Sequence, residues 1–169
     1  MRTLKASDIS AKVSAMIREA SVRLPDDVKA AFAAAEAAEE LSSAKEIFRQ
    51  LRENSALSEK SGLPLCQDCG LAIFFVEAGE DLKVEGATLR QAIEDGMIAG
   101  YKDGYLRKSS CDPFTRKNTG DNSPSIIHFD LVPGDGLKIA FMAKGGGSEN
   151  MSRVTMLAPA QGWKGIRNF

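Results

Sequence analysis

The chain has 169 residues, of which 43% are apolar and 27% are charged, and this is the composition of a globular domain large enough to bury a core. The net charge of -1 offers no basic surface for nucleic acid, and no apolar run reaches the length of a membrane span. Residues 1–14 lack the apolar segment of a secretory signal, so we expect one cytoplasmic domain covering residues 1–169.

The N-terminal third of the sequence has the patterns of helices. Apolar side chains recur at helical spacing over residues 9–17, and Ser7 or Asp8 is expected to cap that helix. A second helix is predicted to begin at Pro25, which two acids and an alanine-rich stretch follow. A third is predicted over residues 43–54, where a serine and a glutamate three positions apart form a capping box.

The hydrophobic period changes in the middle of the chain. Residues 71–76 form an apolar run typical of a buried strand, and a second short strand is predicted over residues 82–85. Thr88 begins another capping box. Apolar side chains then recur every four residues from Leu89 to Tyr105, and they predict one long central helix with a single apolar face that ends near residue 107.

The last third is expected to contain loops and strands. Residues 108–124 are predicted to form a loop, because Ser, Asp, Pro, Asn and Gly dominate there. Residues 125–132 and 137–143 are predicted strands, and the Pro-Gly-Asp-Gly between them favours a hairpin. A further strand over 151–157 and a helix within 159–169 are expected. The patterns predict an α+β fold with a helical N-terminal part, a long central helix and a mostly antiparallel sheet.

The run 65–70 sets Cys66 beside Gln67 and Asp68, just ahead of the first apolar strand. Thiolates select zinc, copper(I) or iron–sulfur clusters over hard cations, and a neighbouring carboxylate can move protons. These residues alone leave two interpretations of Cys66 open, the rim of a metal-dependent site and a buried inert thiol. Cys69 is expected to be a small core residue.

The chain has three cysteines and one histidine. An odd number of cysteines without an export signal argues against a disulfide framework. A zinc site would require Cys111 and His128 to join the Cys-x-x-Cys pair, so a zinc-binding adaptor is a weak third interpretation. His128 alternates with apolar neighbours and is expected to lie on a sheet face rather than act as a base.

Two later loops have compositions suited to binding an anion. The polar loop, residues 112–122, is expected either to bind a small dicarboxylate together with Arg107 or to be a solvated loop. The glycine loop, Gly145, Gly146 and Gly147, directly follows an apolar strand. Consecutive glycines let backbone N–H groups converge on an anion, and this placement favours a site over a flexible turn.

Four motifs follow one another in the order found in class I fumarases, the iron–sulfur hydro-lyases related to tartrate dehydratase. They are Pro-Leu-Cys-Gln-Asp at 64–68, Leu-Arg at 106–107, Arg-Lys-Asn-Thr-Gly-Asp-Asn at 116–122 and Lys-Gly-Gly-Gly-Ser-Glu-Asn at 144–150. From about residue 10 to its end, the chain resembles the N-terminal, or α, region of this family. The last motif resembles the fumarase version, because tartrate dehydratases tend to depart from it after the glycines.

This resemblance implies an enzyme that reversibly hydrates fumarate to L-malate with an oxygen-sensitive 4Fe–4S cluster. Cys66 matches the first of the family's three cluster cysteines, and the other two lie further along the family's α region than this chain extends. We therefore expect a chain that is truncated at its C-terminus and that alone holds no intact cluster and is inactive. A β subunit or a C-terminal domain is the expected partner, in a homo- or hetero-oligomer.

The other candidate site residues carry over position by position. By resemblance, Gln67 and Asp68 match substrate-contacting positions, and Arg107 matches a carboxylate-binding arginine. The glycine loop matches a stretch that lines the substrate pocket. Cys69 stands where the family usually has threonine, which removes a hydroxyl from that position.

Adding water across a double bond flanked by carboxylates needs a Lewis acid for the hydroxyl, a group that moves the proton, and donors for the developing charge. The resemblance assigns the first role to an open iron, and Asp68 is our candidate for the second. Arg107 and the amides of the glycine loop are expected to supply part of the third. Two alternatives stay open, an L-tartrate dehydratase α-type chain and a subunit-docking module without chemistry of its own.

Overall fold

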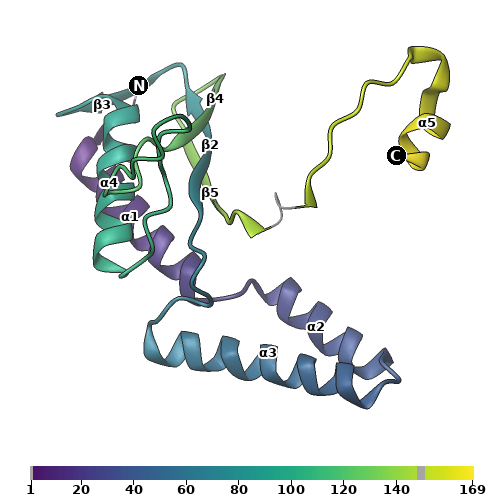
Figure 1. Cartoon of the computed structure of the whole chain (residues 1–169). Coiled ribbons are helices and arrows are strands. Elements are labelled where there is room, and N and C mark those ends of the chain that lie inside the picture. The colour runs from purple at the N-terminus through teal and green to yellow at the C-terminus, as the bar shows by residue number, and fades with distance from the viewer. Residues whose placement is uncertain (1, 148–150) are drawn as a thin grey trace.

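The computed structural model describes residues 2–147 and 151–169 (Figure 1). Its elements, in chain order, are β1 (Arg2–Lys5), α1 (Ala6–Val22), α2 (Asp26–Ala38), α3 (Ser42–Ser61), β2 (Leu71–Gly79), β3 (Leu82–Glu85), α4 (Leu89–Asp103), β4 (Ile126–Val132), β5 (Leu137–Lys144), the short 3₁₀ helix η2 (Pro159–Gln161) and α5 (Gly162–Asn168). These helices and mixed sheets confirm the expected α+β class. No helix among the described residues is long and apolar enough to cross a membrane.

The strand order corrects the expected sheet. β2 is the central strand, and it pairs in parallel with β4 and antiparallel with β5. β1 and β3 form a separate parallel pair. Among the described strands, therefore, one pairing of three is antiparallel, and the predicted direct hairpin between β4 and β5 is wrong.

β2 has the most buried side chains of the three-stranded sheet, and a turn closes over its C-terminal end. Phe74 and Val76, in the middle of this central strand, are at most 2% exposed. The Pro-Gly-Asp-Gly turn then bridges over the end of β2, where the Gly79 N–H donates to Gly136 O at 2.8 Å. A Cβ on Gly79 would lie 2.2 Å from Gly134 O, so this close approach requires glycine.

The core lies between one face of the three-stranded sheet and the helices α1 and α4, which run side by side (Figure 1). Its largest fully buried side chains include Tyr101, Phe74, Ile17, Ile93, Met97, Leu106, Val13 and Val76. Gly96 lets the helices approach closely, because a Cβ there would lie 2.5 Å from Ser10 O. Thr88 caps α4 as predicted, accepting from the Gln91 N–H, but the helix ends at Asp103 and Tyr105 is 85% exposed beyond it.

The other face of the sheet is open to solvent and partly apolar. Phe75 is 47% exposed there, and its ring stacks on the His128 ring with centroids 5.0 Å apart. His128 is thus a sheet-face residue, as expected. The side chains of β2 therefore alternate between a packed face and an exposed face, whereas its continuous apolar run was typical of a strand buried on both faces.

Two parts of the chain lie outside this core. The α2–α3 pair packs mainly on itself, and α3 runs to Ser61, seven residues past the predicted end near residue 54. The predicted strand over 151–157 is wrong, since no described strand pairs with it and Met151, Val154 and Met156 are 79%, 94% and 93% exposed. Figure 1 shows this segment and α5 lying apart from the rest of the chain.

Candidate active site

The loop that carries the predicted catalytic residues is anchored at both ends. At its start, the Leu65 N–H donates to Ser21 O at 2.9 Å, and Asn54 Nδ2 on α3 donates to Leu65 O at 2.8 Å. At its end, Gly70 has a φ of 63°, and a Cβ there would lie 2.2 Å from Lys144 O. The loop is therefore held between the end of α1 and the end of β5.

Asp68 contacts the glycine loop directly. The Gly146 N–H donates to Asp68 Oδ2 at 2.9 Å, and a Cβ on Gly145 would lie 2.9 Å from the same oxygen. These two segments are 78 residues apart in the sequence. The structure thus brings together two motifs that the sequence marked separately, and a glycine at position 145 is what permits the contact.

The two cysteines of this loop have opposite environments. Cys66 is exposed, and its thiol lies 3.6 Å from Asp68 O. Cys69 is 8% exposed, and burial raises the pKa of its thiol. Cys69 is therefore the small core residue that was expected, whereas the exposed Cys66 thiol is accessible to a metal.

Arg107 lies beside the same loop. Leu106, which is 2% exposed, anchors the chain just after α4, and its N–H donates to Tyr101 O at 3.0 Å. The next backbone N–H, that of Arg107, favours the thiolate of Cys69 and partly offsets the effect of burial on its pKa. The Arg107 and Gln67 side chains are both exposed. The described contacts thus place the Arg107 backbone next to the loop and leave its guanidinium available to an anion.

The glycine loop is described as far as Gly147. Gly145 is half-buried against Asp68, while Gly146 and Gly147 are exposed. Lys144 Nζ donates to Gly145 O at 3.0 Å, which turns a cation toward the start of the loop. The last three residues of the Lys-Gly-Gly-Gly-Ser-Glu-Asn motif, 148–150, lie outside the described residues.

The polar loop is ordered by its own side chains. Asp112 Oδ1 accepts from the N–H of Phe114, from the N–H of Thr115 and from the Thr115 hydroxyl. Hydrogen bonds from Thr115 hold the pKa of Asp112 below its usual range, and bonds from Ser123 do the same for Asp121. Both acids thus close turns within the loop.

Two residues that sequence reasoning did not assign to the site contact the loop from inside. Tyr101 donates its hydroxyl to Cys69 O at 2.8 Å, and Asn122 donates Nδ2 to Gly70 O at 3.1 Å. Tyr101 was expected on the apolar face of the central helix, and Asn122 was one of two amides in the polar loop. A buried tyrosine hydroxyl needs a partner, which is the one signal that could have pointed to this contact.

Metal-ligating side chains are sparse in the part of the chain that the structure describes. No group of three or more His, Cys, Asp or Glu side chains there could hold a metal ion. Cys66 is thus an exposed thiol without such a group of ligands around it among the described residues. This absence also leaves the zinc adaptor without a described ligand set.

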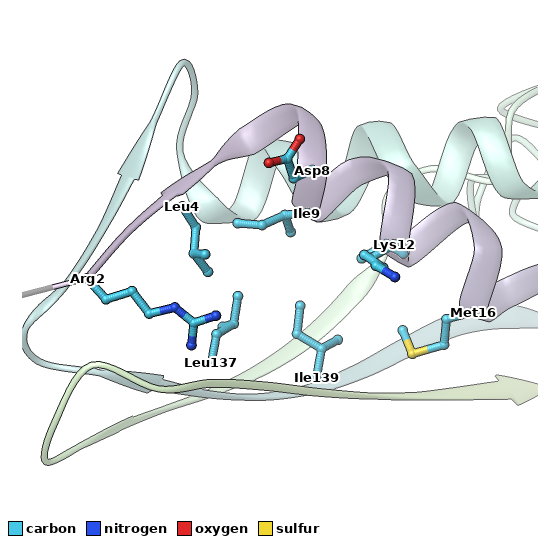
Figure 2. Close-up of a pocket in the computed structure, with 9 residues that line it drawn as sticks. Arg2, Leu4, Asp8, Ile9, Lys12, Met16, Leu137 and Ile139 are labelled. Atoms are coloured by element: carbon cyan, nitrogen blue, oxygen red, sulfur yellow. The ribbon is translucent and has the colours of Figure 1, made fainter.

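An apolar groove is lined by other residues of the chain (Figure 2). It has a volume of about 390 Å³ and lies between the start of α1 and β5. Its lining residues are Arg2, Leu4, Asp8, Ile9, Lys12, Val13, Met16, Leu137 and Ile139. None of the predicted site residues lines this groove, so the candidate site is defined by its contacts and not by this cavity.

Comparisons with known proteins support the family that the four motifs indicate. The family model described as Fumarate hydratase (Fumerase) matches residues 10–169. The putative L(+)-tartrate dehydratase subunit alpha of Methanocaldococcus jannaschii is 36% identical over 98% of this chain and 59% of that protein. The L(+)-tartrate dehydratase subunits alpha of Escherichia coli O157:H7 and Escherichia coli K12 are 33% and 31% identical, over 98% of this chain and 54% of each.

The chain spans little more than half the length of these curated relatives. The family match nevertheless begins near the start of α1 and includes Cys66, Asp68, Arg107 and the glycine loop. From the sequence motifs, the contact between two of them, and this match over residues 10–169, we conclude that the chain belongs to the Fumarate hydratase (Fumerase) family.

Proposed function

We propose that this chain forms part of the active site of an iron–sulfur hydro-lyase that reversibly hydrates fumarate to L-malate. The observation that carries the proposal is the hydrogen bond of 2.9 Å between the Gly146 N–H and Asp68 Oδ2. It joins a proton-transfer candidate to an anion-binding loop, two residues along the chain from an exposed thiol. The family match supports the reaction class.

Asp68 is the residue to which we assign proton transfer. The described hydrogen bond uses Oδ2, so Oδ1 is the oxygen that we expect to exchange a proton with the substrate carbon. Asp68 is half-buried, and Gly145 packs against its carboxyl group. These contacts fix the direction of the carboxylate, and a fixed direction is what general acid–base catalysis requires.

Cys66 is the residue that we propose as a ligand of a 4Fe–4S cluster. Its thiol is exposed and thiolate sulfur is the usual ligand of such clusters, so it fits one ligand position. When bound, the cluster supplies a Lewis acid for the hydroxyl group. The described residues offer no further cluster of ligands, so we propose that a β subunit or a C-terminal domain supplies the rest and that this chain alone is inactive.

Arg107, Gln67 and the glycine loop are proposed to bind the dicarboxylate. The exposed Arg107 guanidinium offers paired donors that match a carboxylate. The Gly145 and Gly147 amides are the chain neighbours of the Gly146 amide, which donates to Asp68. We propose that they bind a carboxylate oxygen of the substrate. Together these donors would stabilise the negative charge that builds up beside the reacting carbon.

A second substrate is favoured by a specific observation. The relatives described above are named as L(+)-tartrate dehydratase subunits alpha, with the name of the Methanocaldococcus jannaschii protein given as putative. Loss of water from L-tartrate is the same class of reaction on a four-carbon diacid with one more hydroxyl group. The same residues would therefore serve either substrate, and the identity of the diacid depends on contacts to the second hydroxyl.

The test is an assay of the assembled enzyme. The chain is produced without air together with its complementary subunit or domain and loaded with iron and sulfide, and L-malate and L-tartrate are offered separately. We expect turnover of L-malate with formation of fumarate, and turnover of L-tartrate instead would replace the substrate but keep the reaction class. An iron-loaded assembly that dehydrates neither diacid would overturn the proposal and favour a docking module.

A further inference from the structure

Asn122 is the most completely enclosed polar side chain of the described core. It is 0% exposed, although it lies at the end of an otherwise exposed polar loop. Its backbone φ is 71°, a conformation that asparagine tolerates better than most residues. A buried amide in a left-handed backbone conformation costs stability unless its hydrogen bonds are satisfied, so the contacts of this side chain indicate what it is for.

The amide of Asn122 joins two segments. Its Oδ1 accepts from the Ser109 N–H at 2.7 Å and from the Ser110 N–H at 3.0 Å. Its Nδ2 donates to Gly70 O at 3.1 Å. The first segment follows Arg107 and the second ends the loop of Cys66 and Asp68, so one side chain connects the two halves of the candidate site.

Tyr101 reinforces the same connection from α4. Its hydroxyl donates to Cys69 O at 2.8 Å and lies 3.3 Å from Gly70 O. Burial raises the pKa of the Tyr101 phenol, so the hydroxyl stays a donor throughout the ordinary pH range. Two buried donors from different elements thus converge on two consecutive carbonyl groups, and they determine how the loop enters β2.

We propose that Asn122 is a positioning residue of the candidate active site, which holds the loop of Cys66 and Asp68 in register with the segment of Arg107. This inference rests on the function proposed above. A carboxamide suits this place, because its oxygen accepts from the Ser109 and Ser110 N–H groups while its NH₂ group donates to Gly70 O. Without this NH₂ donor, Gly70 is no longer held, so the loop and the hydrogen bond between Asp68 and Gly146 are expected to become more mobile. The packing of the α1–α4 core is expected to stay the same.

Asn122→Asp tests this role on the full 169-residue chain. The substitution keeps the shape and both accepted bonds but places an oxygen opposite Gly70 O. We expect amide hydrogen exchange in residues 65–71 and at Gly146 to accelerate about ten- to hundredfold, since a buried bond is lost, while α1 and α4 exchange as before. Asn118→Asp is the matched control, because Asn118 donates to Lys108 O in the same loop and is exposed.

A second variant covers the case in which Asn122→Asp does not fold. Asn122→Gly adopts the left-handed backbone without strain and removes all three side-chain bonds. We expect the same local acceleration from it. Exchange at wild-type rates in residues 65–71 and at Gly146, or an equal acceleration throughout α1 and α4, would overturn the proposal, because a positioning residue must act on the loop and not on the whole core.

The assembled enzyme provides an independent readout. There we expect the Asn122 variants to lower kcat about ten- to hundredfold with little change in KM, since Arg107 still binds the diacid while Asp68 is misdirected. A normal kcat in an active assembly overturns the positioning role and leaves the proposed function intact. Loop-specific exchange in a chain whose assembly has no hydro-lyase activity overturns the proposed function and leaves the local anchoring role.

Discussion

The glycine loop and the polar loop were both candidate anion sites by sequence. They differ in the partners with which their polar groups form hydrogen bonds. The glycine loop donates the Gly146 N–H to Asp68, in a segment 78 residues away. The polar loop uses Asp112 to accept from Thr115, three residues away, and is exposed over most of its length. A loop that donates outward to a candidate catalytic group has the properties of a site, whereas a loop that closes on itself has the properties of a support.

The ends of the polar loop sharpen this contrast. Its exposed part bonds within itself and to residues 108–110 just before it, whereas Asn122 at its end is buried and connects to Gly70. Among the described contacts, this buried amide joins the polar loop to the loop of Cys66 and Asp68. The following predictions, ordered by expected size, test whether the two loops are as different as their contacts indicate.

The largest effect is expected from Asp68→Asn in the assembled, iron-loaded enzyme. The amide keeps the volume but cannot exchange a proton, so we expect kcat to fall by about 10²- to 10⁴-fold. Asp112→Asn is the matched change in the other loop and should leave kcat close to that of the wild type. Steady-state dehydration of the preferred diacid measures both, and equal losses from the two variants would erase the distinction between the loops.

Arg107→Met should act mainly on substrate affinity. Removal of a charged, bidentate donor from a carboxylate is expected to raise KM about ten- to hundredfold. Arg116→Met, in the exposed part of the polar loop, is the control and should change KM little. The same kinetic assay measures KM for both variants. A larger rise in KM for Arg116→Met than for Arg107→Met would indicate that the polar loop binds the diacid.

Gly145→Ala should disturb Asp68 without touching the chemistry itself. The added Cβ would lie 2.9 Å from Asp68 Oδ2, which forces the carboxyl group or the loop to move, and we expect kcat to fall about tenfold. Gly136→Ala is the control, because a Cβ there meets nothing within 4 Å. If the two variants have the same kcat, the contact between Asp68 and the glycine loop is not needed for turnover.

The smallest effect is expected from the acid dependence of the polar loop. The hydrogen bonds from Thr115 lower the pKa of Asp112 in the folded chain, so its stabilising contribution is present above the unfolded pKa and is lost as the pH falls through the lower folded value. Stability should therefore decline below about pH 4 and do so less in Asp112→Asn. Chemical denaturation at several pH values measures this, and identical slopes would contradict it.

Local patterns anticipated much of the secondary structure. The strand at 82–85, the Thr88 cap and the buried face of α4 at Ile93, Met97 and Tyr101 follow from neighbouring residues alone. The strand expected at 151–157 failed because a strand needs a partner, and the described strands provide none for it. The hairpin expected between β4 and β5 failed because the turn between them spans a third strand, β2.

The sequence by itself determined the family and the candidate site residues: the Cys66 thiol, the neighbouring Asp68, Arg107 and the glycine loop, in the order of that family's motifs. Only the tertiary structure decided that Asp68 meets Gly146 and that Asn122 and Tyr101 hold the loop from within. The physical reason is the distance along the chain between the residues involved. Residue type and periodicity are local properties, whereas the contact across 78 residues depends on the pairing of β2 with β5. That pairing places Leu71 opposite Lys144, so the loop before β2 and the glycine loop after β5 lie side by side.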